Sequence, residues 1–125
     1  MAVLRKRVNI YRGEIWVVDL HAGVGWEVAK KRPALVISNN QINRISPLVV
    51  IIPISSRIPE ILGPERILIS KKQTGLVKDS VMMINQIRTI DKKRLVSKTG
   101  KISEERLLEV EESLKLVLGM VDLDN

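Results

Sequence analysis

The run Asp79-Ser80-Val81-Met82-Met83-Ile84-Asn85-Gln86-Ile87-Arg88-Thr89-Ile90-Asp91 places an amide and a guanidinium among strand-forming apolar residues. Such polar groups are costly inside a sheet unless they are satisfied or have a task. In an extended strand, Gln86 and Arg88 alternate at period two and emerge on one face. The run therefore predicts a strand from Val81 to Ile90 with a polar reading face. The plainer alternative is a sheet edge where Arg88 pairs with Asp79 or Asp91 and Gln86 satisfies backbone groups.

Outside this run, other segments have the composition and length of short strands. Turn residues separate the segments, among them Gly23, Gly25 and the polar stretch from Ser38 to Ser46. Five or more short strands at this spacing predict a small barrel or a strongly bent antiparallel sheet. The other predicted strands are Glu14 to Leu20, Ala34 to Ile37, Leu48 to Ile52 and Arg66 to Ile69.

A helix is predicted to follow the strands. Ser103 is a favourable N-cap, and Glu104 and Glu105 lie in the first turn, where carboxylates favour the positive end of the helix dipole. The fold class is therefore mainly β with a C-terminal helix (α+β), in one domain over residues 1–125. One apolar stripe at three- and four-residue steps is expected to pack on the sheet: Leu107, Val110, Leu114, Val117, Leu118 and Val121.

Charge is distributed unevenly along the chain. Residues 1–101 carry 19 Lys and Arg against 7 Asp and Glu, a net charge of +12, whereas residues 102–125 have a net charge of −5. A cationic body attracts phosphate backbones through counterion release. The composition favours a nucleic-acid partner, with a merely solvated basic surface as the alternative.

Several classes of function lack support in the sequence. Cysteine is absent, so disulfides and thiolate metal sites are excluded, and His21 is the only histidine. We expect no metal and no cofactor, because His and carboxylates do not cluster and no phosphate-binding Gly-rich motif is present. The opening seven residues lack the apolar segment of a secretion signal, and no apolar run is long enough to span a bilayer. A cytoplasmic protein that does not enter membranes is expected.

Two further segments carry chemistry. Gly25-Trp26-Glu27-Val28-Ala29-Lys30-Lys31-Arg32-Pro33 joins two predicted strands and combines an aromatic, a carboxylate and three consecutive cations. Ile54-Ser55-Ser56-Arg57 places hydroxyls where an apolar strand ends. Each segment alone is more typical of an ordinary loop or strand exit. Together with the Gln86 and Arg88 run, they indicate a surface that binds phosphates.

The order and spacing of these motifs resemble the MazF/PemK family of toxin endoribonucleases. The resemblance covers roughly residues 11 to 118 without large gaps. It is carried by Arg12-Gly13-Glu14-Ile15-Trp16, Asp19-Leu20, Gly25, Glu27, Arg32-Pro33-Ala34-Leu35-Val36-Ile37, Asn43-Arg44, Ser46-Pro47, Ile54-Ser55, Gly75-Leu76, Asp79-Ser80-Val81, Gln86-Ile87-Arg88-Thr89-Ile90-Asp91-Lys92 and Arg94-Leu95.

The resemblance implies a small SH3-like barrel of the MazF/CcdB toxin type that forms a homodimer and cuts single-stranded RNA, including mRNA, without a metal. It implies a cognate acidic antitoxin of the MazE kind as partner. Cleavage would fall to Arg32 and Ser55. Apart from the resemblance, Glu27 is the candidate for accepting the 2′-OH proton or orienting Arg32. The implied RNA-binding residues are Gly25, Trp26, Lys30, Lys31, Ser56, Gln86 and Arg88.

The chain departs from the family pattern at two places. Ser55 stands where threonine is common, which keeps the hydroxyl but loses a methyl group. The loop that starts at Gly25 is bulkier and more basic than the usual Gly-rich one, and Trp26 in it is either a stacking platform for a base or a cover for the end of the barrel. Two other functions stay open: RNA binding without cleavage, and gyrase poisoning of the CcdB type.

Overall fold

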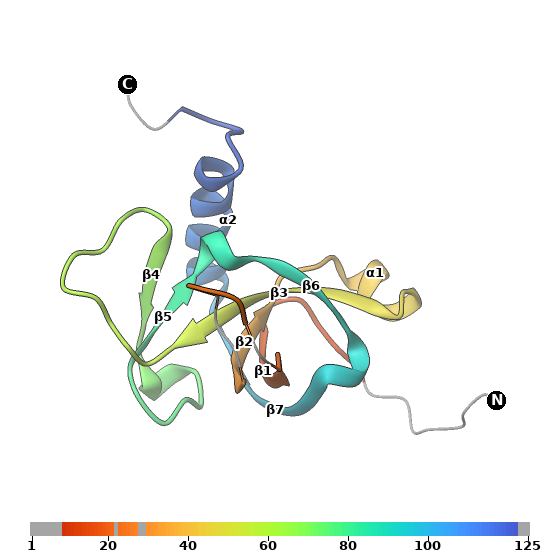
Figure 1. The fold of residues 1–125 in the computed structure, drawn as a ribbon. Helices are drawn as coiled ribbons and strands as arrows, with labels where there is room; N and C mark the ends of the chain where they lie inside the picture. Colours follow the sequence, from red (N-terminus) through yellow and green to blue (C-terminus); the bar gives the residue numbers. More distant parts are fainter. Residues whose placement is uncertain (1–8, 22, 28–29, 123–125) are drawn as a thin grey trace.

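The computed structural model describes residues 9–21, 23–27 and 30–122. The expectation about the opening seven residues therefore lies outside the described part of the chain. In chain order the elements are β1 (Glu14–Asp19), β2 (Lys31–Val36), α1 (Asn40–Ile45), β3 (Leu48–Ser55), β4 (Arg66–Ile69), η1 (Lys71–Gln73), β5 (Ser80–Met83), η2 (Ile84–Gln86), β6 (Arg88–Asp91), η3 (Lys92–Arg94), β7 (Leu95–Lys101) and α2 (Glu104–Val117) (Figure 1).

The strands form an antiparallel sheet in the order β4-β5-β3-β2-β1-β7, and β6 pairs with β3 off this path. The long strand β3 is shared: its first half pairs with β6, and its end pairs with β5 through Ile54↔Met82 and Ser55↔Val81. This change of partner bends the sheet strongly. The sheet is not closed, because no ladder joins β4 to β7 within the described residues. Antiparallel strands followed by a C-terminal helix confirm the predicted fold class.

Alternation along the strands produces two apolar clusters, one on each face of the sheet. Ile15, Leu35 and Ile52 belong to the cluster that α2 covers through Val110. The neighbouring residues along the same strands, such as Trp16 and Val36, belong to the other cluster. Side chains at period two thus give the sheet two buried faces.

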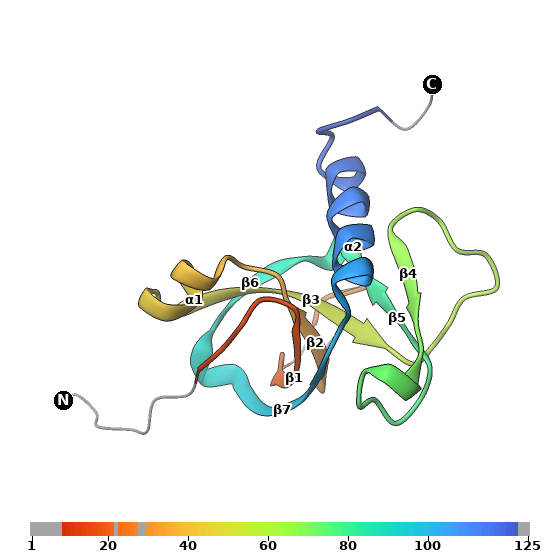
Figure 2. The same ribbon diagram turned by 180° about the vertical axis from the view of Figure 1, so that it is seen from behind.

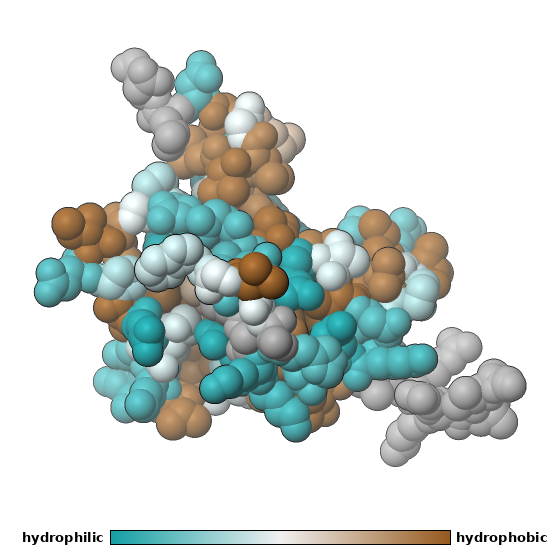
Figure 3. All heavy atoms as spheres, in the orientation of Figure 1, coloured by the Kyte–Doolittle hydropathy of each residue, from teal (hydrophilic) through white to brown (hydrophobic). Residues whose placement is uncertain are grey.

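Helix α2 begins as predicted, because the Ser103 hydroxyl oxygen accepts a hydrogen bond from the backbone N–H of Arg106 at 3.2 Å. Val110 is buried, and α2 packs beside η2 and β4 (Figure 2). The helix ends at Val117, so the predicted stripe is too long: Leu118 and Val121 lie beyond it and are exposed. Brown, apolar surface gathers where this end of α2 projects from the molecule (Figure 3).

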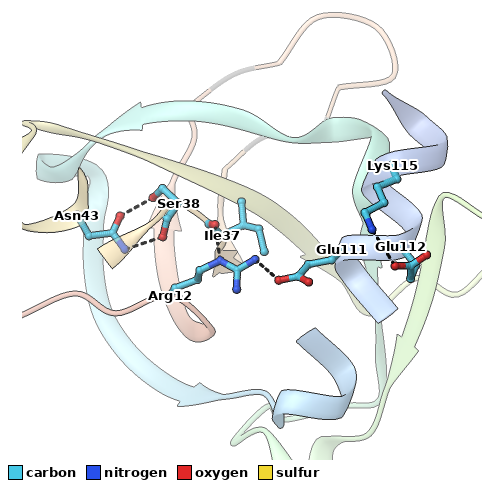
Figure 4. A network of polar contacts seen from close by, with 7 residues as sticks. All are labelled: Arg12, Ile37, Ser38, Asn43, Glu111, Glu112 and Lys115. Atoms are coloured by element: carbon cyan, nitrogen blue, oxygen red, sulfur yellow. Dashed lines mark hydrogen bonds and ion pairs between the residues drawn. The ribbon is translucent and has the colours of Figure 1, made fainter. Parts of the chain in front are cut away.

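Hydrogen bonds and an ion pair connect α2 to the sheet (Figure 4). The Arg12 guanidinium donates to the backbone carbonyl of Ile37 at 3.0 Å and to Glu111 of α2 at 2.6 Å. On the other side of Ile37, Ser38 and Asn43 are buried and bonded to one another. These contacts fix the end of β2 against both helices.

Helix α1 was not predicted, because the stretch from Ser38 to Ser46 has the composition of a turn. Its start is set by Asn39, whose side-chain oxygen accepts hydrogen bonds from the backbone N–H groups of Gln41 and Ile42 at 2.7 and 3.4 Å. Its only buried residue is the polar Asn43. Because α1 has no apolar stripe, its sequence pattern does not predict a helix.

Candidate functional site

Arg32 and Ser55 come together because β2 and β3 are antiparallel. Ala34 pairs with Pro53 in the ladder between these strands, and Arg32 and Ser55 lie two residues beyond this pair in the same direction. Side chains two residues apart in a strand share a face. Arg32 is also paired with Val18 in β1, so neighbouring strands fix both backbone positions.

A groove with a volume of about 1000 Å³ lies over this end of β2 and β3. Its walls come from the β1–β2 loop, the segment after β3, β4 and β5. Eight of the ten predicted site residues line it: Trp26, Glu27, Lys30, Lys31, Arg32, Ser55, Ser56 and Gln86. Gly25 is exposed and lines neither this groove nor the pocket beside it.

The groove is strongly cationic. Glu27 is its one acidic residue among the described lining residues, and the cations are Lys30, Lys31, Arg32, Arg57, Arg66 and Lys78. Burial lowers the pKa of Arg32, and the like charge of Arg57 lowers it further. A partly desolvated guanidinium beside a second cation favours an anionic ligand, so the groove can bind phosphate groups.

Ser55 is oriented by its own strand end. Its hydroxyl oxygen accepts a hydrogen bond from the backbone N–H of Arg57 at 3.1 Å, and its side chain is half-buried. A hydroxyl that accepts in this way still has a proton to donate. Ser55 can therefore donate a hydrogen bond to an oxygen of a ligand held by Arg32.

The loop between β1 and β2 forms one wall. It is closed at its base by hydrogen bonds from Leu20 N to Lys30 O at 3.1 Å and from Lys30 N to His21 O at 2.6 Å. Glu27 accepts a hydrogen bond from Val24 N at 2.9 Å, which tightens the turn near the tip of the loop. Val28 and Ala29 lie outside the described residues.

Trp26 stands out from this loop with 98% of its surface exposed, yet it borders the groove. A ring this exposed does not cover the end of the sheet, so that interpretation is wrong. An exposed indole beside cations is suited to stacking on an unpaired base.

A second pocket of about 650 Å³ adjoins the groove and shares Trp26, Glu27, Arg66 and Gln86 with it. Both Asn85 and Arg88 line this pocket, and neither lines the groove. Gln86 and Arg88 therefore reach one continuous surface, as predicted, although for a different reason.

The predicted continuous strand from Val81 to Ile90 is wrong. The 3-10 turn η2 separates β5 from β6, and the backbone N–H of Ile87 bonds to the carbonyl of Ile84 at 3.2 Å. The turn is held because Ile84 N donates to Glu65 O at 2.9 Å. Gln86 thus lies in a turn, and Arg88 begins the next strand.

The plainer alternative for Arg88 also fails. Asp79 accepts a hydrogen bond from Lys71 N at 2.9 Å, and Asp91 accepts one from Lys93 N at 2.8 Å. Both carboxylates satisfy backbone groups at the starts of 3-10 turns. Within the described part of the chain, neither forms an ion pair with Arg88.

Sequence reasoning did not assign a role to five polar residues of this surface: Arg57, Arg66, Lys78, Ser80 and Asn85. Arg57 directly follows the two serines, which was a usable signal. Arg66 and Asn85 are 19 positions apart in the chain, and only the β4–β5 pairing brings them to a hydrogen-bond distance of 2.8 Å.

Other kinds of site find no support among the residues that the structure describes. No three His, Cys, Asp or Glu side chains form a group that could hold a metal ion. No described helix is long and apolar enough to cross a membrane.

The chain is similar to known proteins both in sequence and in structure. Residues 11–118 match the family model of the PemK-like, MazF-like toxins of type II toxin-antitoxin systems. The chain is 38% identical over 116 residues to the endoribonuclease MazF of Staphylococcus epidermidis, covering 93% of this chain and 97% of that protein. It is 37% identical over 113 residues to the endoribonuclease EndoA of Bacillus subtilis, covering 90% and 97%. The crystal structure of MazE-MazF from Deinococcus radiodurans has a chain with a TM-score of 0.75 and 23% identity, covering 92% of this chain and 100% of that one.

Proposed function

Because the chain belongs to the PemK-like, MazF-like toxins of type II toxin-antitoxin systems, we propose that it is a sequence-specific endoribonuclease that cleaves single-stranded RNA. Two relatives of more than 35% identity are named endoribonucleases. Cleavage of mRNA inhibits translation and growth. The observation that carries the proposal is the cationic groove in which Arg32 and Ser55 lie at one end of adjacent strands.

The reaction that suits these residues needs no metal. The ribose 2′-OH attacks the adjacent phosphorus, the bond from phosphorus to the 5′-oxygen breaks, and the leaving oxygen takes up a proton. The products are a 2′,3′-cyclic phosphate and a 5′-OH end. The enzyme has to stabilise the extra negative charge on the pentacoordinate phosphorus, which is electrostatic work.

Arg32 performs this work by donating directed hydrogen bonds to the phosphoryl oxygens. Its lowered pKa does not make it a base, because arginine stays protonated at neutral pH. Ser55 donates its hydroxyl proton to another phosphoryl oxygen, while the backbone of Arg57 holds the hydroxyl oxygen. Glu27, the only acidic residue among the described lining residues of the groove, accepts the 2′-OH proton or orients Arg32.

The remaining predicted residues bind the RNA strand. Lys30, Lys31 and Ser56 contact its phosphates along the groove, and Trp26 stacks on a base. Gln86 and Arg88 contact bases in the adjoining pocket, and Gly25 gives the loop a turn with φ of 59°.

The partners follow from the same family. The MazE-MazF structure supports an acidic antitoxin of the MazE kind, which would occupy the cationic groove. The active form is a homodimer of a single domain over residues 1–125, and it acts in the cytoplasm, where mRNA is translated.

One experiment tests the function directly. Purified protein free of antitoxin is incubated with a long single-stranded RNA in excess EDTA, and the cut sites and end groups are mapped. Discrete cuts with cyclic-phosphate and 5′-OH ends are expected. Arg32→Ala should slow cleavage at least about 10²-fold. Arg44→Ala, at an exposed position on α1, is the matched control and should cleave like the wild type. RNA that is bound but intact would indicate a binding module.

A further inference from the structure

We propose that the pocket beside the groove selects a keto base, guanine or uracil, and that Arg66 and Asn85 are the specificity-determining residues. This inference rests on the proposed function, because it concerns the RNA bound in the same groove. The pocket volume of about 650 Å³ is ample for one nucleobase. Because Trp26 and Arg66 line both cavities, a base held here belongs to a nucleotide close to Arg32 and Ser55.

The pair is preorganised. Arg66 Nη1 donates to Asn85 Oδ1 at 2.8 Å. The backbones are fixed relative to each other as well, because Arg66 is in register with Met83 and Ile84 N donates to Glu65 O at 2.9 Å. A ligand therefore meets two side chains that are already held in place, which lowers the entropic cost of binding.

The hydrogen bond between Arg66 and Asn85 also determines which of their polar groups remain available to bind a base. It engages the amide oxygen of Asn85, so the amide N–H₂ is the group left to donate. Arg66 uses one of its five N–H donors for this bond, and Arg88 adds a second guanidinium to the lining. The pair thus offers donors to a base edge.

Donors discriminate between base types. The carbonyl groups of guanine and uracil accept hydrogen bonds from Arg66 and Asn85, as arginine does with guanine O6 and N7 in duplex recognition. Adenine and cytosine carry an exocyclic amino group at the equivalent place. This group is itself a hydrogen-bond donor, so it would face the N–H donors of Arg66 and Asn85 without an acceptor between them. Trp26 can stack on any base and adds affinity without selecting.

Binding can be measured without cleavage by using short 2′-O-methyl RNAs, which lack the attacking hydroxyl. All positions are adenine except a central one that is uracil, guanine, adenine or cytosine. Fluorescence anisotropy should show about tenfold tighter binding for a central keto base than for either amino base, and comparison of uracil with guanine identifies the preferred one.

Two variants test the residues. Arg66→Met should reduce the keto preference to about twofold or less. Asn85→Asp keeps the bond to Arg66 but replaces the amide donor by a carboxylate acceptor, so the preference should move toward adenine or cytosine. Arg106→Met is the matched control, because Arg106 Nη1 also donates to a side-chain oxygen at 2.8 Å, but on α2 and outside both cavities. Its base preference should equal that of the wild type.

The outcomes separate this inference from the proposed function. Unchanged keto preference in folded Arg66→Met and Asn85→Asp proteins, or no preference in the wild type, overturns the inference, even if long RNA is cut. A keto preference that both variants alter supports the inference, even if the wild type cuts no RNA, in which case the cleavage proposal alone fails. Circular dichroism establishes that each variant is folded.

Discussion

The hydroxyl oxygen of Ser55 accepts a hydrogen bond from the backbone N–H of Arg57 at 3.1 Å. This contact orients the hydroxyl at the end of β3 and leaves its proton for a phosphoryl oxygen. Ser55→Ala should therefore lower the single-turnover cleavage rate by about 10- to 10³-fold, whereas Ser55→Thr should retain most of the rate. Equal rates for the two variants would remove the hydroxyl from the mechanism.

Substitution of Trp26 should change the affinity for RNA without changing the thermal stability of the protein. Because 98% of its surface is exposed, Trp26→Ala should leave the melting temperature within about 1 °C of the wild type. Loss of a stacked base should weaken single-stranded RNA binding by about 5- to 100-fold. Trp26→Phe is the matched variant and should recover most of the affinity. Unchanged affinity in Trp26→Ala would show that no base stacks there.

The sequence was sufficient to predict the central strands and the pair of Arg32 and Ser55. Apolar runs bounded by turn residues identified β1 to β4, and the serine cap identified the start of α2. The catalytic roles of Arg32 and Ser55 were implied by the family resemblance. The residue pattern alone indicated only that the segments around them, one before a proline and one at the end of an apolar strand, could bind phosphates.

Features that depend on long-range pairing were missed. Strand β7 is mostly exposed and carries Lys98 and Lys101 at the edge of the sheet, so it lacks the apolar alternation of a buried strand. The break at η2 depends on Glu65, whose carbonyl receives the backbone N–H of Ile84. Arg66 acquires its place in the site only through the same pairing of β4 with β5.

Glu14 makes stability depend on acid pH. Its buried carboxylate accepts hydrogen bonds from Tyr11 N at 2.9 Å and Trp16 Nε1 at 3.0 Å, and it pairs with Lys98 at 2.8 Å. Burial raises the pKa of Glu14, but the contacts with Lys98, Tyr11 and Trp16 lower it more, so the net pKa lies below the ordinary value of 4.5. The resulting stabilisation is present above pH 4.5 and is lost as the pH falls through the folded-state pKa.

Glu14→Gln should therefore reduce the free energy of unfolding by about 1–3 kcal/mol at pH 7, and the difference from the wild type should shrink below pH 4.5. Urea denaturation at pH 7 and at pH 3 measures both values. Glu109→Gln, which breaks an exposed ion pair with Arg106, is the control and should change little at either pH. A constant gap between Glu14→Gln and the wild type across this range would contradict the argument.

Lys31 lies exposed in the groove wall, where it is expected to contact an RNA phosphate without reading sequence. Lys31→Gln should weaken binding of all RNA sequences by a similar factor. The slope of log affinity against log salt should become shallower by about 0.7, the value for one phosphate of a single strand. Lys115→Gln, on α2 beside Glu112, should leave the slope unchanged. If Lys31→Gln instead altered the preferred base with an unchanged salt slope, Lys31 would be a base-reading residue. The proposal that the groove binds phosphates while the pocket with Arg66 and Asn85 selects the base would then be wrong.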